Sequence, residues 1–504
     1  WRKIALALWR FGPEIREPEG SGRLGELWKQ LPADTRVPDH SIWDHLDLVS
    51  AFAGAFAADA DGQAALLVFT LGPVQSFIQA ARKTDDLWAG SHLLSRLLWE
   101  AARPLCEELG PDAIVFPRLR GIALVDLWLR DRMGLPPVLF ENCPWRDRAP
   151  DANPLFAAAL PNRFVAIVPA SRAVELAERC RDEVRAWLLD LGLRVVDRLL
   201  ETAGYRTPGT ERDESVPAYQ QMREQLRNYP EVHWAVTPFS LIRARDASRQ
   251  TALDVRELEE AMAPFYEVAP DKAPGFLDSD AWKLLRGDIA LPDGTTFYSP
   301  NPGVLYPAIY DLNERLLAAA KSVRRFDPAR HEGWRCTLTG EAEWLTTDRA
   351  HLHVPKGERA SGKVETLWTR IAERKPAWAK RGEHLSALPA IKRLWPTLFA
   401  EEVKGETRGL TERFVVSTHT MALARQLEDW LQDHRTDAEV LKELEDRIAE
   451  TQPGQVALPR RLVVKHRDNP RLELARQIPA LLDAARESED EARWQEDQRI
   501  VRLA

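Results

Sequence analysis

Polar and charged side chains gather in one stretch of the sequence, Leu71–Ser95, which reads LGPVQSFIQAARKTDDLWAGSHLLS. The Asp85-Asp86 doublet could have either of two roles. Carboxylates at a helix start accept backbone N–H groups, and carboxylates also bind divalent metal ions. The spacing favours the helix cap, because apolar residues with a helical period follow. Gly90 and Ser91 lie beside a position where the backbone could approach a ligand closely. Turn and packing roles explain the same residues without a ligand.

The elements around this stretch follow from hydrophobic periodicity. Ala65–Leu71 is a continuous apolar run, typical of a strand buried on both faces. Gly72-Pro73 ends the strand, and helical spacing of apolar residues then predicts two successive helices. Three further strands are predicted at Ala113–Pro117, Arg163–Pro169 and Val232–Thr237, with an amphipathic helix at Arg172–Leu193.

The predicted order is therefore strand, helices, strand, strand, helix, strand, which is the ferredoxin-like pattern. From about residue 365 the chain is mostly helical and charged. The fold class expected is α+β, a ferredoxin-like domain followed by mainly helical domains.

The stretch Leu71–Ser95 closely resembles the first Palm domain of the large subunit of Cmr-type (type III-B) CRISPR effector complexes, in the CRISPR-associated protein ten family. There a strand leads into Gly-Pro-Val-Gln-x-Phe-Ile, followed by Ala-Arg-x-Thr-x-Asp-Leu-Trp-x-Gly-Ser. Shorter resemblances follow in the family's order, at Leu160–Phe164, Val232–Val236, Gly303–Phe326, Leu385–Ala387 and Val416–Ala422.

The resemblance implies four consecutive segments. Residues 1–60 would be a helical N-terminal segment, a remnant of the family's HD nuclease domain, and 61–240 the first Palm. Residues 241–360 would be a mixed domain with a degenerate zinc element, and 361–504 a helical linking domain.

The resemblance also implies a function. In the family, two ATP molecules bind between two Palms, which make a cyclic oligoadenylate when target RNA pairs with the guide RNA. Gln75, Ser91 and His92 would supply half of an ATP site here. The implied partners are the other Cmr-complex subunits, the CRISPR guide RNA and the target RNA, with no membrane and in the cytoplasm.

The sequence departs from the family pattern at its metal sites. It has no Gly-Gly-Asp-Asp, the loop of the second Palm that holds Mg²⁺ or Mn²⁺. The second Palm is expected roughly where the sequence ends, so it would lie elsewhere. No His-Asp dipeptide of an HD nuclease is present, and Thr339 stands where a second thiolate would join Cys336. One cysteine cannot close a tetrahedral site, so neither structural zinc nor any other metal site is predicted.

Composition limits the remaining functions. The net charge of -8 argues against a stand-alone nucleic-acid binder. Local basic residues could still face nucleic acid or a partner, and the candidates are Arg82, Lys83, Arg324, Arg325, Lys392 and Arg393. The four cysteines have no paired spacing, which indicates a reducing compartment. Two hypotheses stay open: a scaffold subunit without catalysis of its own, and a cyclic oligoadenylate synthetase completed by a second Palm outside this sequence.

Overall fold

The computed structural model describes residues 1–15, 24–34, 39–146, 153–246, 249–266, 272–323, 330–360, 363–406, 416, 418–432, 438–451, 453, 456–487 and 491–503. Contacts divide the chain into two units. The first unit comprises residues 1–77, 91–142 and 158–391, and the second comprises 78–90, 143–157 and 392–504.

A four-stranded antiparallel sheet forms the centre of the first unit. Its strands are β1 (Ala64–Gly72), β2 (Ile114–Phe116), β3 (Arg163–Pro169) and β4 (Glu231–Pro238). Their order across the sheet is β2-β3-β1-β4. The register sets Phe69 opposite Phe164 on β3 and opposite Trp234 on β4. The four strands predicted from the sequence are therefore confirmed, each within one residue at either end.

Strand β1 is the buried centre of this sheet, as its unbroken apolar run predicts. Eight of its nine residues are buried. On one face, Leu66 and Val68 pack with Ile309 and Leu312 of α10 (Tyr306–Ser322). Asn313 of α10 also donates to the carbonyl oxygen of Leu66 over 2.7 Å. Successive side chains of a strand point to opposite faces of the sheet. Phe69 therefore lies on the other face, where its ring stacks on that of Phe164 with the ring centroids 4.9 Å apart.

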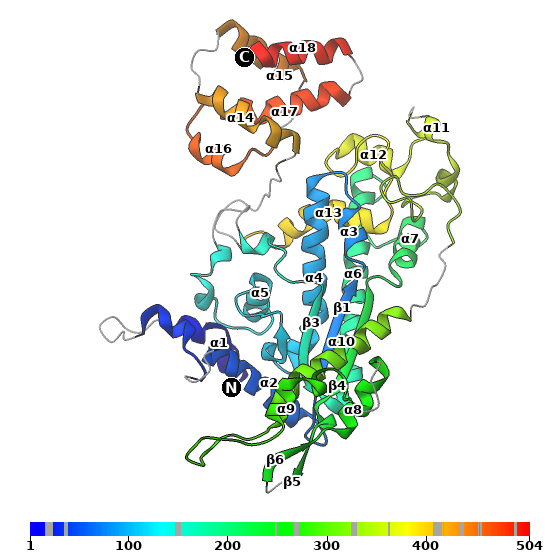
Figure 1. Ribbon diagram of the computed structural model, residues 1–504. Coiled ribbons are helices and arrows are strands. Elements are labelled where there is room, and N and C mark those ends of the chain that lie inside the picture. The colour runs from blue at the N-terminus through cyan, green and yellow to red at the C-terminus, as the bar shows by residue number, and fades with distance from the viewer. Residues whose placement is uncertain are drawn as a thin grey trace. The chain divides into compact units, whose positions relative to one another are not determined.

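Two long helices run alongside the sheet, α4 (Thr84–Glu108) and α6 (Ala173–Ala203) (Figure 1). Helix α6 continues well past Leu193, where the sequence pattern placed its end. Val196 and Leu200 prolong its apolar face and are buried. The helix stops at Gly204, whose φ of +79° is the left-handed conformation that glycine adopts readily at a helix end.

The remaining elements of the chain are short helices and two hairpins. The helices before α14 are α1 (Arg2–Phe11), α2 (Ile42–Ala58), α3 (Gln75–Gln79), α5 (Ala123–Asp131), α7 (Pro217–Leu226), α8 (Arg256–Met262), α9 (Asp280–Leu285), α11 (Lys356–Ala360), α12 (Leu367–Arg374) and α13 (Ala387–Glu402). The hairpins are β5 (Arg243–Asp246) with β6 (Arg249–Asp254), and β7 (Ile289–Ala290) with β8 (Thr296–Tyr298).

The C-terminal helices of the second unit have a core of their own. They are α14 (Thr418–Gln432), α15 (Ala438–Thr451), α16 (Arg460–Lys465), α17 (Leu472–Glu487) and α18 (Glu491–Leu503). Buried leucines from four of them meet, including Leu427, Leu444, Leu462 and Leu481. Within the described parts of the chain, no helix combines the length and the apolar character needed to span a bilayer.

The fold class α+β is confirmed by this sheet and its helices. The division into the segments 1–60, 61–240, 241–360 and 361–504 stays a prediction.

We predict that Phe164→Ala lowers the free energy of unfolding by about 3–5 kcal/mol, because it removes a fully buried ring from the sheet. The matched control is Phe297→Ala, whose ring is 59% exposed and whose loss should cost about 0.5 kcal/mol or less. Urea unfolding followed by circular dichroism measures both. Equal losses in the two variants would contradict this account of the core.

Candidate functional site

The segment between α3 and α4 is held by a buried carboxylate. The Asp86 side chain accepts the backbone N–H groups of Arg82 and Lys83 at 3.0 and 3.2 Å. Asp86 lies in the first turn of α4, which begins at Thr84. The expected cap therefore forms in an altered way: the carboxylate ties down the residues before the helix instead of its own first N–H groups.

Arg393 of α13 completes the surroundings of Asp86. Its guanidinium donates to both carboxylate oxygens, at 2.8 and 3.1 Å, and each side chain of the pair is only 2% exposed. Burial by itself raises the pKa of Asp86, but the hydrogen bonds and charge of Arg393 outweigh it and lower the pKa below its ordinary value. Asp86 is thus an ionised anchor within the protein.

Lys392, the neighbour of Arg393, is buried against the same segment. Its Nζ donates to the carbonyl oxygens of Ala80 and Ile78 at 2.7 and 3.4 Å. Burial lowers the pKa of Lys392 from 10.5 to about 8; the charge of Asp86 opposes this change and that of Arg393 adds to it. Lys392 and Arg393 together fasten residues 78–86 to α13.

Gly90 is required by this packing. A Cβ atom at Gly90 would lie 3.2 Å from the Cα of Ile78 and 3.3 Å from the Cε of Lys392. Gly90 therefore lets α4 lie close to Ile78 and Lys392. The close approach at Gly90 is one between parts of the protein.

Two predicted nucleic-acid contacts need correction. Lys392 and Arg393 were predicted as contacts to nucleic acid or a partner, yet they are 1% and 4% exposed and bound to protein groups. Arg82 is exposed and Lys83 half-buried, so both remain candidates for an outward contact. Arg324 and Arg325 lie outside the described residues.

The three residues predicted for ATP are placed differently from one another. Gln75 is exposed at the start of α3, and Ser91 is half-buried within α4. His92 is 1% exposed, so it is a core residue and its predicted role as an accessible nucleotide ligand is not supported.

The zinc element predicted to be degenerate is held by hydrogen bonds. The Cys336 thiol is buried and accepts the backbone N–H of Leu338 at 3.4 Å. Nearby, the Gln221 amide donates to the Glu343 carboxylate at 2.7 Å and to the Trp344 carbonyl at 3.1 Å. Across the described ranges, no group of three or more His, Cys, Asp or Glu side chains is placed to hold a metal ion.

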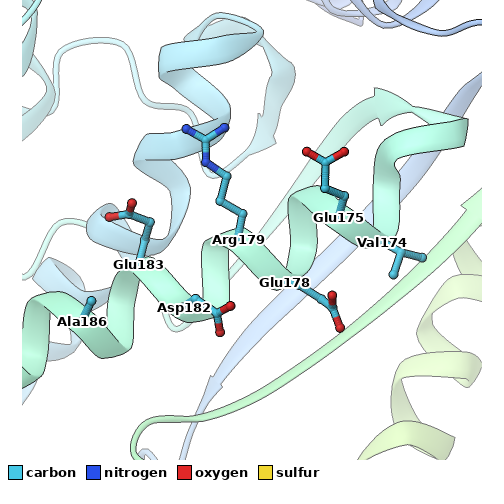
Figure 2. A pocket seen from close by; sticks show the side chains of 7 residues that line it. All are labelled: Val174, Glu175, Glu178, Arg179, Asp182, Glu183 and Ala186. Atoms are coloured by element: carbon cyan, nitrogen blue, oxygen red, sulfur yellow. The ribbon is translucent and has the colours of Figure 1, made fainter.

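A hollow of about 630 Å³, which the sequence did not predict, lies along the N-terminal half of α6 (Figure 2). Figure 2 shows its lining side chains, Val174, Glu175, Glu178, Arg179, Asp182, Glu183 and Ala186. Its charged groups already have protein partners: Arg179 pairs with Glu108 at 2.7 Å, and Glu175 with Arg172 at 3.0 Å. We therefore assign it no ligand.

The pairing of Asp86 with Arg393 was missed in the sequence, since the two residues are 307 positions apart. One signal was available. Lys392 and Arg393 interrupt an apolar helical run, Ala390-Ile391 before them and Leu394-Trp395 after them. Charges in such a run are rarely buried unless they are paired.

Comparison with known proteins agrees with the motif. Residues 66–192 match the family described as CRISPR-associated protein Cmr2, N-terminal. The chain is 28% identical over 330 residues to the CRISPR system Cmr subunit Cmr2 of Pyrococcus furiosus, covering 65% of this chain and 32% of that protein. It is 42% identical over 95 residues to the CRISPR system CMR subunit Cmr2 of Saccharolobus solfataricus, covering 18% of this chain and 9% of that protein.

A solved structure has a similar fold. The cryo-EM structure of type III-B Cmr-beta in the apo state contains a chain that superposes with a TM-score of 0.52 at 16% identity, covering all of this chain and 48% of that one. The chain thus spans about a third of the Pyrococcus protein and about half of the solved one.

The matched residues 66–192 include the motif after β1 and the strands β2 and β3. Residues 66–192 thus match the N-terminal family of Cmr2, and the chain is similar to Cmr2 subunits over part of their length.

We predict that Arg393→Met lowers the free energy of unfolding by about 3–5 kcal/mol, because it leaves the Asp86 carboxylate buried without its partner. The matched control is Arg425→Met, which breaks the exposed pair of Arg425 with Asp429 and should cost about 0.5 kcal/mol or less. Guanidinium unfolding at pH 7 compares the two. A loss in Arg393→Met as small as in the control would show that the pair is not enclosed.

Lys392 should make stability depend on pH. Its folded-state pKa of about 8 is below the ordinary 10.5, so between these values the unfolded chain holds a proton that the folded chain has released. Stability therefore rises with pH across this window, by about 3 kcal/mol for a shift of this size. Unfolding free energies measured from pH 7.5 to 10.5 should rise more steeply for the wild type than for Lys392→Met.

The control for this pH dependence is Lys283→Met, at a lysine with 51% side-chain exposure, which should keep the wild-type slope. A wild type and Lys392→Met with parallel pH profiles would mean that Lys392 is not buried in solution.

Proposed function

We propose that this chain is the N-terminal part of the large subunit of a type III-B CRISPR RNA-guided complex, and that its sheet is a ferredoxin-like Palm. The observation that carries the proposal is the motif Leu71–Ser95 directly after the central strand of a sheet with the order β2-β3-β1-β4. Strand, helix, strand, strand, helix, strand is the chain order of the ferredoxin-like fold. The family match over residues 66–192 supports it.

The partners follow from the relatives. The similar Pyrococcus and Saccharolobus proteins are Cmr subunits by name, so we infer that this chain assembles with other Cmr subunits around the CRISPR guide RNA and the target RNA. The net charge of -8 supports contact with RNA mainly through those subunits. Arg82, exposed within the fixed segment 78–86, is the basic residue best presented for an outward contact.

The chain would contribute half of an ATP site for cyclic oligoadenylate synthesis. Gln75 and Ser91 fit this role, because an amide and a hydroxyl that reach solvent can hydrogen-bond a nucleotide. The buried Asp86–Arg393 pair fixes the segment that lies between Gln75 and Ser91 in the sequence. Bound ATP would supply the α-phosphate for the reaction. Metal-binding carboxylates would come with a second Palm, since the sequence lacks Gly-Gly-Asp-Asp.

The test is a Cmr complex reconstituted around the complete reading frame with guide and target RNA. Gln75→Ala with Ser91→Ala should lower cyclic oligoadenylate formation at least about tenfold while target RNA binding is kept. Gln79→Ala, exposed on the same helix α3, is the matched control and should act as the wild type. Unchanged synthesis in the double variant would refute the ATP contacts.

A second candidate, a purely structural subunit, is favoured by the missing Gly-Gly-Asp-Asp and by the lack of a carboxylate cluster among the described residues. The intact mass of the subunit from its native complex separates the two. A mass near 57.2 kDa would favour the structural role, and a much larger mass the synthetase.

A further inference from the structure

Helix α2 is apolar on two opposite faces. Residues 48–58, LVSAFAGAFAA, contain no charged side chain. On one face Ala51 and Ala55 are buried against Ala64 of β1 and Ile167 of β3. A helix that is apolar all round is normally enclosed on all sides, so a second covering for α2 is expected.

The face opposite this contact is open. Leu46, Val49, Ala53 and Phe56 are exposed there, with Leu46, Val49 and Phe56 at 49%, 51% and 46%. Their spacing of three, four and three residues places them in one line along the helix. We call these four residues the α2 stripe. Exposed apolar residues that form a continuous patch mark an interaction surface more often than scattered ones do.

Exposed apolar residues are also frequent in the part of the chain that contains α2. Of the 23 large hydrophobic residues exposed in the described parts of the chain, nine lie within residues 1–58. That is far more than this short part of the chain would hold if exposed apolar residues were spread evenly. They are Trp1, Ile4, Leu8, Ile15, Leu27, Leu46, Leu48, Val49 and Phe56.

The charge of α2 selects the kind of partner. The helix has no Lys or Arg, and its only charged side chains apart from His45 are Asp44 and Asp47. Arg118 and Arg120 pair with Asp44 and Asp47 at 2.7 and 2.5 Å, so these charges are balanced, and the α2 stripe itself offers a nucleic acid no cation. A helix that lies in a membrane interface carries Lys or Arg on its polar side. An uncharged apolar surface of another protein is the partner that this composition fits.

We propose that the α2 stripe docks the apolar, uncharged face of a helix from a neighbouring protein subunit. Anchors at i, i+3, i+7 and i+10 are the spacing with which one helix lies against another apolar surface. Ala53 and Ala57, both exposed and small, let the two backbones come close. The inference rests on the proposed function, since it needs a multi-subunit complex.

The experiment uses the full chain, with Val49→Gln and Phe56→Gln combined, co-purified with the other Cmr subunits and guide RNA. The matched control combines Val464→Gln with Phe297→Gln, at a valine and a phenylalanine that are 66% and 59% exposed elsewhere. All the replaced side chains are exposed, so every variant should unfold within about 0.5 kcal/mol of the wild type. Retention in the complex should fall at least about tenfold for the stripe variant and stay unchanged for the control.

Val49→Leu with Phe56→Leu keeps the surface apolar and should restore retention, which separates apolar docking from any effect of substitution as such. A stripe variant that is retained like the wild type would overturn the docking site alone. A wild-type chain that stays outside the complex would overturn the proposed function, and the docking site with it, because no neighbouring subunit would remain to cover α2.

Discussion

Strand β1 has a neighbour on both edges and side chains packed on both faces, and this enclosure constrains everything that follows it in the chain. Hydrogen bonds to β3 and β4 fix its register, and Asn313 holds the carbonyl of Leu66 from above the sheet. A strand that is fixed in register delivers the next residues to one defined place. The motif begins where β1 ends, so its starting point is set by the core of the sheet.

The motif needs a second constraint, because a short helix and an irregular segment have little stability of their own. The buried contacts of Asp86, Arg393 and Lys392 supply it. Desolvation of charged groups offsets much of what such an ion pair gains, so its net contribution to stability is small. The ion pair instead favours one arrangement of the segment. In any other position of residues 78–86, the buried charges of Asp86, Arg393 and Lys392 would lack partners. The ion pair therefore adds little to the free energy of folding, but it restricts the part of the chain between Gln75 and Ser91 to one arrangement.

The sequence predicted what depends on local patterns. The apolar runs of the four strands, the helix after β3 and the motif residues all carry signals within a few positions of one another. It failed where distant residues decide: the partner of Asp86 lies 307 residues away, so no local pattern identifies it. His92 failed for a related reason. A polar side chain suggested a ligand contact, but the turn of α4 directs His92 into the interior, where it is 1% exposed.

The length of α6 has a mechanical consequence. Its 31 residues extend over about 47 Å, whereas the seven residues of β3 extend over about 23 Å. Roughly half of the helix therefore runs beyond the strand that precedes it, and there it packs with α7 and α12. A continuous hydrogen-bonded helix resists bending, so α6 moves as one rigid element. A tilt of a few degrees at the sheet becomes a shift of a few ångströms at the far end of the helix, beside α7 and α12.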